Sequence, residues 1–80
     1  MPQFLRVLIS KADSGADYVE IARGTWRLGG DPILTGEPIP PEVIKGLEVQ
    51  ACATAEPRGT ITFDRNQVKY AMDFEAIERL

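Results

Sequence analysis

The chain has 80 residues, 44% of them hydrophobic and 26% charged, with a net charge of −3. This length predicts a single domain over residues 1–80 with a small core, and the ordinary apolar share argues against wholesale disorder. The absence of histidine removes the commonest general base and the commonest metal ligand, so we expect no enzyme, no metal and no cofactor. No stretch approaches the roughly 20 apolar residues of a membrane span.

Two strands joined by a turn are predicted at the beginning of the chain. Residues 3–10 alternate, and because both of their faces are partly apolar we expect this strand at the centre of a sheet. Residues 13–17 form the predicted turn, and residues 18–28 a second strand that pairs with the first as an antiparallel hairpin. The apolar pattern of the second strand changes phase around Gly24, which predicts a β-bulge there.

The next segment, residues 29–41, is predicted to be an irregular loop. It contains three glycines and four prolines, a density that excludes regular structure, and loops of this length are often functional. Ile33, Leu34 and Ile39 are expected to fasten it to the body of the protein.

Residues 41–55 allow two interpretations. In the first, they form a helix that begins near Pro41, carries Glu42 in its first turn and turns an apolar stripe toward the core. In the second, a turn ends at Gly46 and an alternating strand follows from Leu47 onward. The alanines of this segment favour the helix, since alanine is a good helix former and a poor strand former.

The clearest pattern is a hairpin near the C-terminus. Residues 60–63 and 68–74 alternate around a polar turn at residues 64–67, so one face of the hairpin is apolar and must be covered. Residues 73–80 are expected to form a short helix capped by Asp73. The predicted order β-β-α-β-β-α makes an α+β fold: a four-stranded antiparallel sheet with one helix packed on a face and a short C-terminal helix.

Two motifs lack the residues that their chemistry needs. The glycine-rich run at residues 24–30 has no Lys-Ser/Thr pair to hold phosphate and magnesium, and we interpret it as a bulge and the end of a strand. Cys52 has no histidine to activate it and no neighbouring cation, so we interpret it as a small, partly buried filler. As the lone cysteine it also indicates a reducing compartment such as the cytosol.

Residues 31–57 are the most acidic part of the chain, with one lysine against five carboxylates. Such a surface, beside a proline-rich loop, is suited to a basic groove on another protein. The predicted partner-binding residues are Asp31, Glu37, Glu42, Glu48, Val49 and Glu56. A second acidic patch near the C-terminus comprises Asp73, Glu75 and Glu78.

Two other functions stay open. A nucleic-acid-binding sheet face would contact phosphates through Arg6, Arg27 and Lys69, but the acidic middle of the chain makes nucleic acid the less favoured partner. Its full set of residues would be Arg6, Arg23, Arg27, Arg65 and Lys69, with Phe4 and Trp26 for stacking. Alternatively, the chain would be a homodimer rather than a monomer, joined through an exposed edge strand or an apolar C-terminal face. That apolar face would comprise Phe74, Ile77 and Leu80.

The C-terminal hairpin carries a resemblance to a known family. Residues 62–68 and 70–73 read TFDRNQV and YAMD, and they resemble a hairpin segment of the small acidic anti-CRISPR proteins of bacteriophages. The general character is also similar to that class: a small, acidic, histidine-free domain without a catalytic set. The resemblance implies a non-enzymatic inhibitor in the cytoplasm of a bacterial host. It would bind a subunit of a CRISPR surveillance complex and block DNA recognition or nuclease recruitment.

Overall fold

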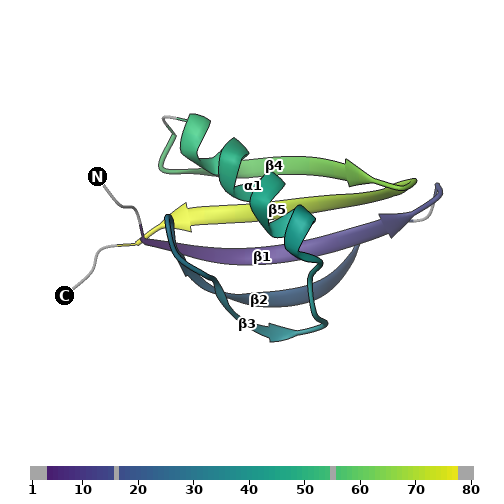
Figure 1. The fold of residues 1–80 in the computed structure, drawn as a ribbon, viewed down its shortest axis with the longest axis horizontal. Coiled ribbons are helices and arrows are strands. Elements are labelled where there is room, and N and C mark those ends of the chain that lie inside the picture. The colour runs from purple at the N-terminus through teal and green to yellow at the C-terminus, as the bar shows by residue number, and fades with distance from the viewer. Residues whose placement is uncertain (1–3, 16, 55, 78–80) are drawn as a thin grey trace.

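The computed structural model describes residues 4–15, 17–54 and 56–77, which form one sheet and one helix. In chain order the elements are β1 (Phe4–Asp13), β2 (Val19–Arg27), β3 (Ile33–Gly36), α1 (Pro41–Ala53), β4 (Arg58–Arg65) and β5 (Val68–Ala76). The antiparallel strands lie in the order β3-β2-β1-β5-β4, and α1 crosses one face of the sheet (Figure 1). We call the face under α1 the inner face and the opposite face the outer face.

The fold is α+β as predicted, but the predicted sheet of four strands with two helices is wrong. The described residues form five strands and one helix. The additional strand, β3, lies inside the segment predicted to be a loop, and it pairs with residues 22–25 of β2. Its four residues fall between Pro32 and Pro38, so the run is too short to show alternation in the sequence.

The predicted C-terminal helix is wrong for the residues that the structure describes. β5 continues to Ala76, and Phe74 pairs with Val7 of β1. The alternation of residues 68–74 marks the strand, and hydrogen bonding to both β1 and β4 holds its extended backbone, which outweighs the helical spacing of a few apolar residues. The remainder of the predicted helix, residues 78–80, lies outside the described residues.

The helix interpretation of residues 41–55 is confirmed for Pro41–Ala53, and the strand interpretation is wrong. A proline at the first helical position is tolerated because its missing N–H would have no partner within the helix. The carbonyl of Pro40 accepts the first amide hydrogen bonds. The residues that α1 buries are spaced four apart and are Val43, Leu47 and Ala51.

β1 lies at the centre of the sheet, as predicted, between β2 and β5. The predicted β-bulge at Gly24 is wrong, because the register of β1 with β2 shifts after Ile9 and leaves Ile21 as the extra residue. Gly24 is needed for a different reason. A Cβ at Gly24 would overlap the carbonyl oxygen of Ile33, so the close approach of β3 to β2 depends on glycine.

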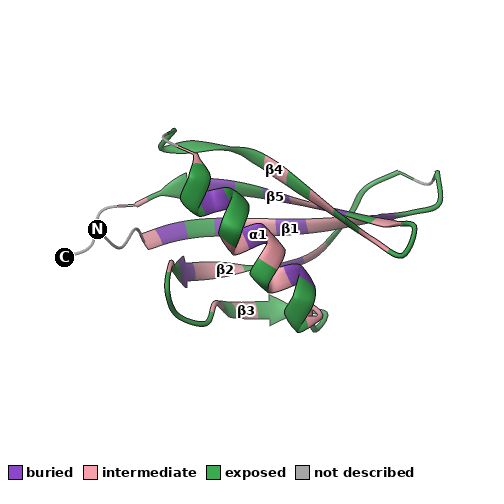
Figure 2. Cartoon of the chain, turned by 45° about the horizontal axis from the view of Figure 1, so that its top comes forward, coloured by how far each residue is buried: buried purple, intermediate pink, exposed green. Residues whose placement is uncertain are grey.

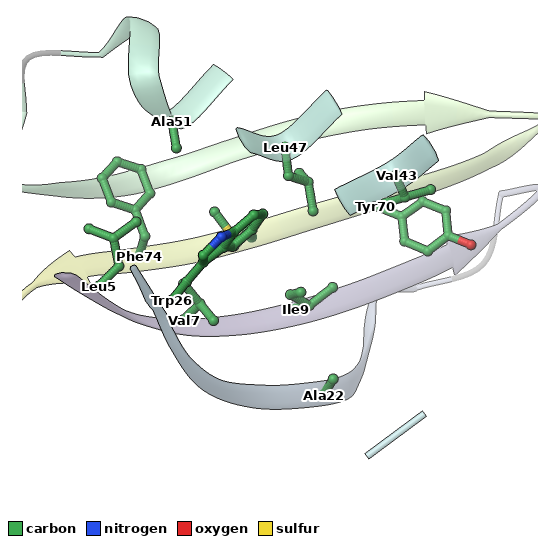
Figure 3. Packing of buried hydrophobic residues seen from close by; sticks show 11 residues of the cluster. Leu5, Val7, Ile9, Ala22, Trp26, Val43, Leu47, Ala51, Tyr70 and Phe74 are labelled. Carbon is green, nitrogen blue, oxygen red and sulfur yellow. The ribbon is translucent and has the colours of Figure 1, made fainter. Parts of the chain in front are cut away.

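The core lies between the inner face and α1, where the buried residues gather (Figures 2 and 3). Its largest fully buried side chain is Trp26, whose indole N–H donates a hydrogen bond of 2.9 Å to the Gly30 carbonyl. Leu34 and Ile39 pack against the core as predicted, whereas Ile33 is 75% exposed and does not fasten the loop. The other buried members of the core cluster are Leu5, Val7, Ile9, Ala22, Val43, Leu47, Ala51, Tyr70, Met72 and Phe74.

The turn between β4 and β5 is shorter than predicted. It consists of Asn66 and Gln67, whose φ angles are 51° and 66°, whereas residues 64 and 65 belong to β4. Two consecutive residues with positive φ are typical of the tight hairpin turns that match strand twist. β4 itself packs against α1 through Phe63, whose ring occupies the space where a Cβ of Gly46 would stand.

Candidate binding surfaces

The six residues predicted to bind a partner do not form one patch. They come from the loops on either side of β3, from α1 and from the segment before β4. All are exposed except Glu48, which is half-buried. Three of the five carboxylates bind groups of the same chain, so part of this acidity holds the fold together.

Two of these carboxylates form ion pairs between distant segments. Glu37 Oε2 lies 2.9 Å from Lys11 Nζ, which links the end of β3 to β1. Glu42 Oε2 lies 3.2 Å from Arg65 Nη2, which links the first turn of α1 to the end of β4. Ion pairs of this kind at the surface stabilise a fold only weakly, because solvent and salt screen them. Their charges are partly neutralised and offer less to a partner than the sequence indicates.

The Lys11–Glu37 pair predicts an alkaline loss of stability. The hydrogen bond and the charge of Glu37 raise the pKa of Lys11 above its usual value of 10.5, while desolvation opposes the shift. Because the folded-state pKa is the higher one, this stabilisation is complete below the unfolded-state pKa and is lost as pH rises through the folded-state pKa. Glu37→Gln is therefore expected to reduce the loss of stability above about pH 10. Urea unfolding at neutral and alkaline pH gives the free energy of unfolding of the wild-type protein and of Glu37→Gln. An equal loss of this free energy in both proteins as pH rises would contradict the prediction.

Asp31 and Glu48 lie together at a hollow between α1 and the loop that follows β2. The hollow has a volume of about 380 Å³ and is lined by Gly30, Asp31, Pro32, Ile39, Pro41, Ile44, Lys45 and Glu48. We call it the acidic hollow. Glu48 Oε2 accepts a hydrogen bond of 2.7 Å from the Gly29 amide, which holds this carboxylate against the loop. Within residues 4–15, 17–54 and 56–77, no hydrogen bond or ion pair engages the Asp31 carboxylate.

The remaining predicted contacts, Val49 and Glu56, do not line the acidic hollow. Val49 is 64% exposed on α1, and the Glu56 amide donates a hydrogen bond to Thr54 Oγ1. Conversely, Ile39 and Ile44 line the acidic hollow but were not among the residues predicted to bind a partner. A signal existed for Ile39, which is an apolar residue between Pro38 and Pro40 within the acidic segment, whereas no comparable signal marks Ile44.

The outer face carries most of the residues of the nucleic-acid hypothesis. The strand registers place Phe4, Arg6, Arg23, Arg27 and Lys69 on this face. The Arg27 guanidinium lies 5.9 Å from the centroid of the Phe4 ring. Arg65 pairs with Glu42 of α1, so its assignment to this face is wrong. Trp26 is buried in the core, which confirms the favoured interpretation of this residue and removes the alternative of stacking on the outer face.

Several outer-face charges are already paired. Arg6 Nη1 lies 3.1 Å from Glu75 Oε1, and Arg23 Nη2 lies 2.6 Å from Glu20 Oε2. A shallow hollow of about 650 Å³ lies between these pairs, over the middle of β1 and its neighbours. The residues that line it are Arg6, Val7, Leu8, Arg23, Gly24, Thr25, Thr35, Asp73, Phe74 and Glu75.

The C-terminal surfaces differ from their predictions. Asp73 accepts a hydrogen bond of 2.6 Å from Thr60 Oγ1, and Glu75 is paired with Arg6, so neither is a free acidic contact. Phe74 is 5% exposed and belongs to the core, so it offers no apolar face to a second copy. Ile77 is half-buried directly after β5, and the other two predicted members, Glu78 and Leu80, lie outside the described residues.

Among the residues that the structure describes, no group of three or more potential ligands is placed to hold a metal ion. Nor does this part of the chain contain a helix with the length and apolarity to cross a membrane. Cys52 is free and exposed on α1, so its interpretation as a partly buried filler is wrong. The chain matches no protein-family model, no curated protein and no solved structure.

Proposed function

We propose that this chain is a non-enzymatic protein-binding domain that docks on a basic protein surface through the acidic hollow. The observation that carries the proposal is the carboxylate of Asp31, which no described residue binds, beside the apolar side chains of Ile39 and Ile44. A lysine or arginine of a partner fits this lining, because its methylene stem packs on apolar surface while its charged head meets the carboxylates. The net charge of −3 adds attraction that speeds association and weakens with salt.

The acidic hollow is supported by groups that restrict its movement. The hydrogen bond between Glu48 and the Gly29 amide joins α1 to the loop on the other side of the hollow. Pro32 and Pro41, whose rings fix the backbone φ angle, stand in its lining. A site that is ordered before binding loses less conformational entropy when a partner arrives, so these contacts favour affinity.

The resemblance of residues 62–73 to phage anti-CRISPR proteins supports a finer form of the proposal. In this form, the partner is a subunit of a CRISPR surveillance complex, and the chain inhibits DNA recognition or nuclease recruitment. Effectors of this kind hold nucleic acid in positively charged channels, which are basic surfaces of the required sign. Expression of the chain in cells whose CRISPR system targets a plasmid would then restore transformation by that plasmid, and an unchanged transformation frequency would contradict the finer form.

Asp31→Lys is expected to weaken partner binding by about tenfold or more, because it places a like charge against the basic side chain of the partner. The matched control is Asp17→Lys, which changes the net charge equally at an exposed position between β1 and β2. The tagged chain captures its partner from nuclease-treated lysate of the source cell. The affinity of that purified partner for the three proteins is then measured by calorimetry at two salt concentrations.

Two results would contradict the surface assignment. The first is equal affinity of the wild-type protein and Asp31→Lys for the captured partner. The second is a loss of affinity that is the same in Asp31→Lys and Asp17→Lys, since it would report net charge rather than the acidic hollow. Loss of the capture on nuclease treatment would instead indicate a nucleic acid.

Binding of single-stranded nucleic acid on the outer face is a second candidate, favoured by one observation. Four cations and an aromatic ring share a sheet face that no described helix covers (Figure 1). Two of the four cations, Arg6 and Arg23, are held in ion pairs, which lowers the positive charge available to phosphates. Protein binding is therefore preferred, and labelled oligonucleotides that remain unbound at low salt would remove the second candidate.

A further inference from the structure

The two edges of the sheet differ in how well they are protected against pairing. β3 has four residues and stands between Pro32 and Pro38. β4, Arg58–Arg65, has eight residues and contains no proline, and no described strand pairs with its outer edge. Short edges and prolines prevent strand addition, whereas a long regular edge is a template for it. β4 is therefore the open edge of this sheet.

The backbone groups that β4 directs outward follow from its pairing with β5. The Pro57 carbonyl accepts a hydrogen bond from the Ala76 amide, so residue 57 faces β5. In an antiparallel pair, inward and outward residues alternate, so the even-numbered residues of β4 turn their N–H and C=O groups to the open edge. Gln50 of α1 donates a hydrogen bond of 3.4 Å to the Thr62 carbonyl, which agrees with this assignment. The outward residues are Arg58, Thr60, Thr62 and Asp64.

We propose that β4 pairs with β4 of a second copy of this chain, antiparallel, about a two-fold axis at Ile61. In this register Arg58 lies opposite Asp64 of the second copy, and Thr60 lies opposite Thr62. All four pairs join outward residues, so each pair exchanges two backbone hydrogen bonds, and in the Thr60–Thr62 pairs the Thr60 N–H of the second copy takes the place of Gln50 at the Thr62 carbonyl. The two sheets become one continuous sheet, and both copies of α1 lie on the same side of it.

Charge selects this register among those that the backbone allows. The two-fold axis produces the Arg58–Asp64 pair twice, with opposite charges directly across the new ladder. Sliding one copy by two residues places Asp64 opposite Glu56 in one direction and opposite Thr60 in the other. The first shift places two negative charges opposite each other, and either shift removes the two ion pairs between Arg58 and Asp64.

The inner-face residues of β4 are also complementary to themselves. Ile61 and Phe63 are half-buried and Gly59 is exposed in the single chain. Around Ile61, the two isoleucines lie opposite each other, and each Phe63 lies opposite Gly59 of the second copy. An aromatic ring beside a strand glycine covers backbone that the glycine leaves open. Pairing would therefore bury apolar surface that one chain leaves in water.

Thr62→Pro is expected to raise the dimer dissociation constant by about 100-fold or more, because it removes an edge N–H and places a ring in the new ladder. The Thr62 N–H faces the open edge, so the single chain loses no hydrogen bond to β5. The matched control is Thr62→Ala, which keeps the N–H and is expected to form dimers. Sedimentation equilibrium from about 1 µM to about 1 mM measures all three proteins. A wild-type protein that stays monomeric, or a Thr62→Pro variant that associates as strongly, would overturn the proposal.

The proposed register is tested by exchanging the charges of Arg58 and Asp64. These variants also test the dimer itself if Thr62→Pro does not fold. Arg58→Asp sets like charges opposite each other twice and is expected to weaken the dimer by about tenfold or more. Adding Asp64→Arg restores opposite charges in the same register and is expected to recover most of that loss. If Arg58→Asp leaves the dissociation constant unchanged, or if the double variant is weaker than Arg58→Asp alone, this register is wrong.

Discussion

Trp26→Ala is expected to lower the free energy of unfolding by about 3–5 kcal/mol. Trp26 is 1% exposed and belongs to the cluster that joins the inner face to α1. Its removal leaves a cavity, and it also leaves the Gly30 carbonyl without the indole donor. A domain of this size is stable by only about 4–12 kcal/mol, so the variant is expected to lose a large share of its total stability.

Urea unfolding followed by circular dichroism measures this effect. Fluorescence does not serve for the variant, because Trp26 is the only tryptophan. Trp26→Phe is the matched control. It keeps an aromatic ring but loses the hydrogen bond, and it is expected to lower the free energy of unfolding clearly less than Trp26→Ala does. An alanine variant within about 1 kcal/mol of the wild-type protein would show that Trp26 is not part of the core.

Gly24→Ala is expected to destabilise the protein by about 2 kcal/mol or more, through backbone rather than side-chain crowding. The new Cβ would overlap the Ile33 carbonyl oxygen and lie 3.0 Å from the Leu34 Cα. Backbone atoms cannot move aside as a flexible side chain does, so β3 must separate from β2. The change therefore tests whether residues 33–36 form a strand in solution.

The control for Gly24→Ala is Gly30→Ala. A Cβ at Gly30 would meet its nearest neighbour, the Arg27 carbonyl oxygen, at an ordinary 3.5 Å. This variant is expected to stay within about 0.5 kcal/mol of the wild-type protein. Trp26 fluorescence during urea unfolding measures the stability of both variants. Equal stability of Gly24→Ala and Gly30→Ala would contradict the pairing of β3 with β2.

The parts of the fold that were predicted correctly are those in which apolar residues recur at a regular spacing over a long stretch of sequence. β1 and the β4–β5 hairpin alternate over many residues, and residues 41–53 have helical spacing with a proline at the start. β3 was missed because four residues between prolines carry no measurable period. The C-terminal helix was predicted because Phe74 and Ile77 also fit a helical spacing, and local spacing does not reveal that β5 has strands on both sides.

The binding surface was less predictable than the fold. The sequence shows where carboxylates are concentrated, but not which of them have partners in the chain. Glu37 meets Lys11 across 26 positions, and Glu42 meets Arg65 across 23. Such pairs are created by tertiary structure, so they are invisible to local charge patterns. Asp31 and Glu48 were both among the predicted contacts, but the hollow that brings them together is formed by the tertiary structure.

The most direct test of the proposed function is a nuclear magnetic resonance titration of the isotope-labelled chain with a lysine- and arginine-rich peptide. The proposal predicts amide shift changes around the acidic hollow, at Asp31, Ile39 and Ile44, that disappear in Asp31→Lys and persist in Asp17→Lys. Changes centred on the outer face, at Leu8 and Thr25, or the same changes in Asp31→Lys as in the wild-type protein, would contradict it.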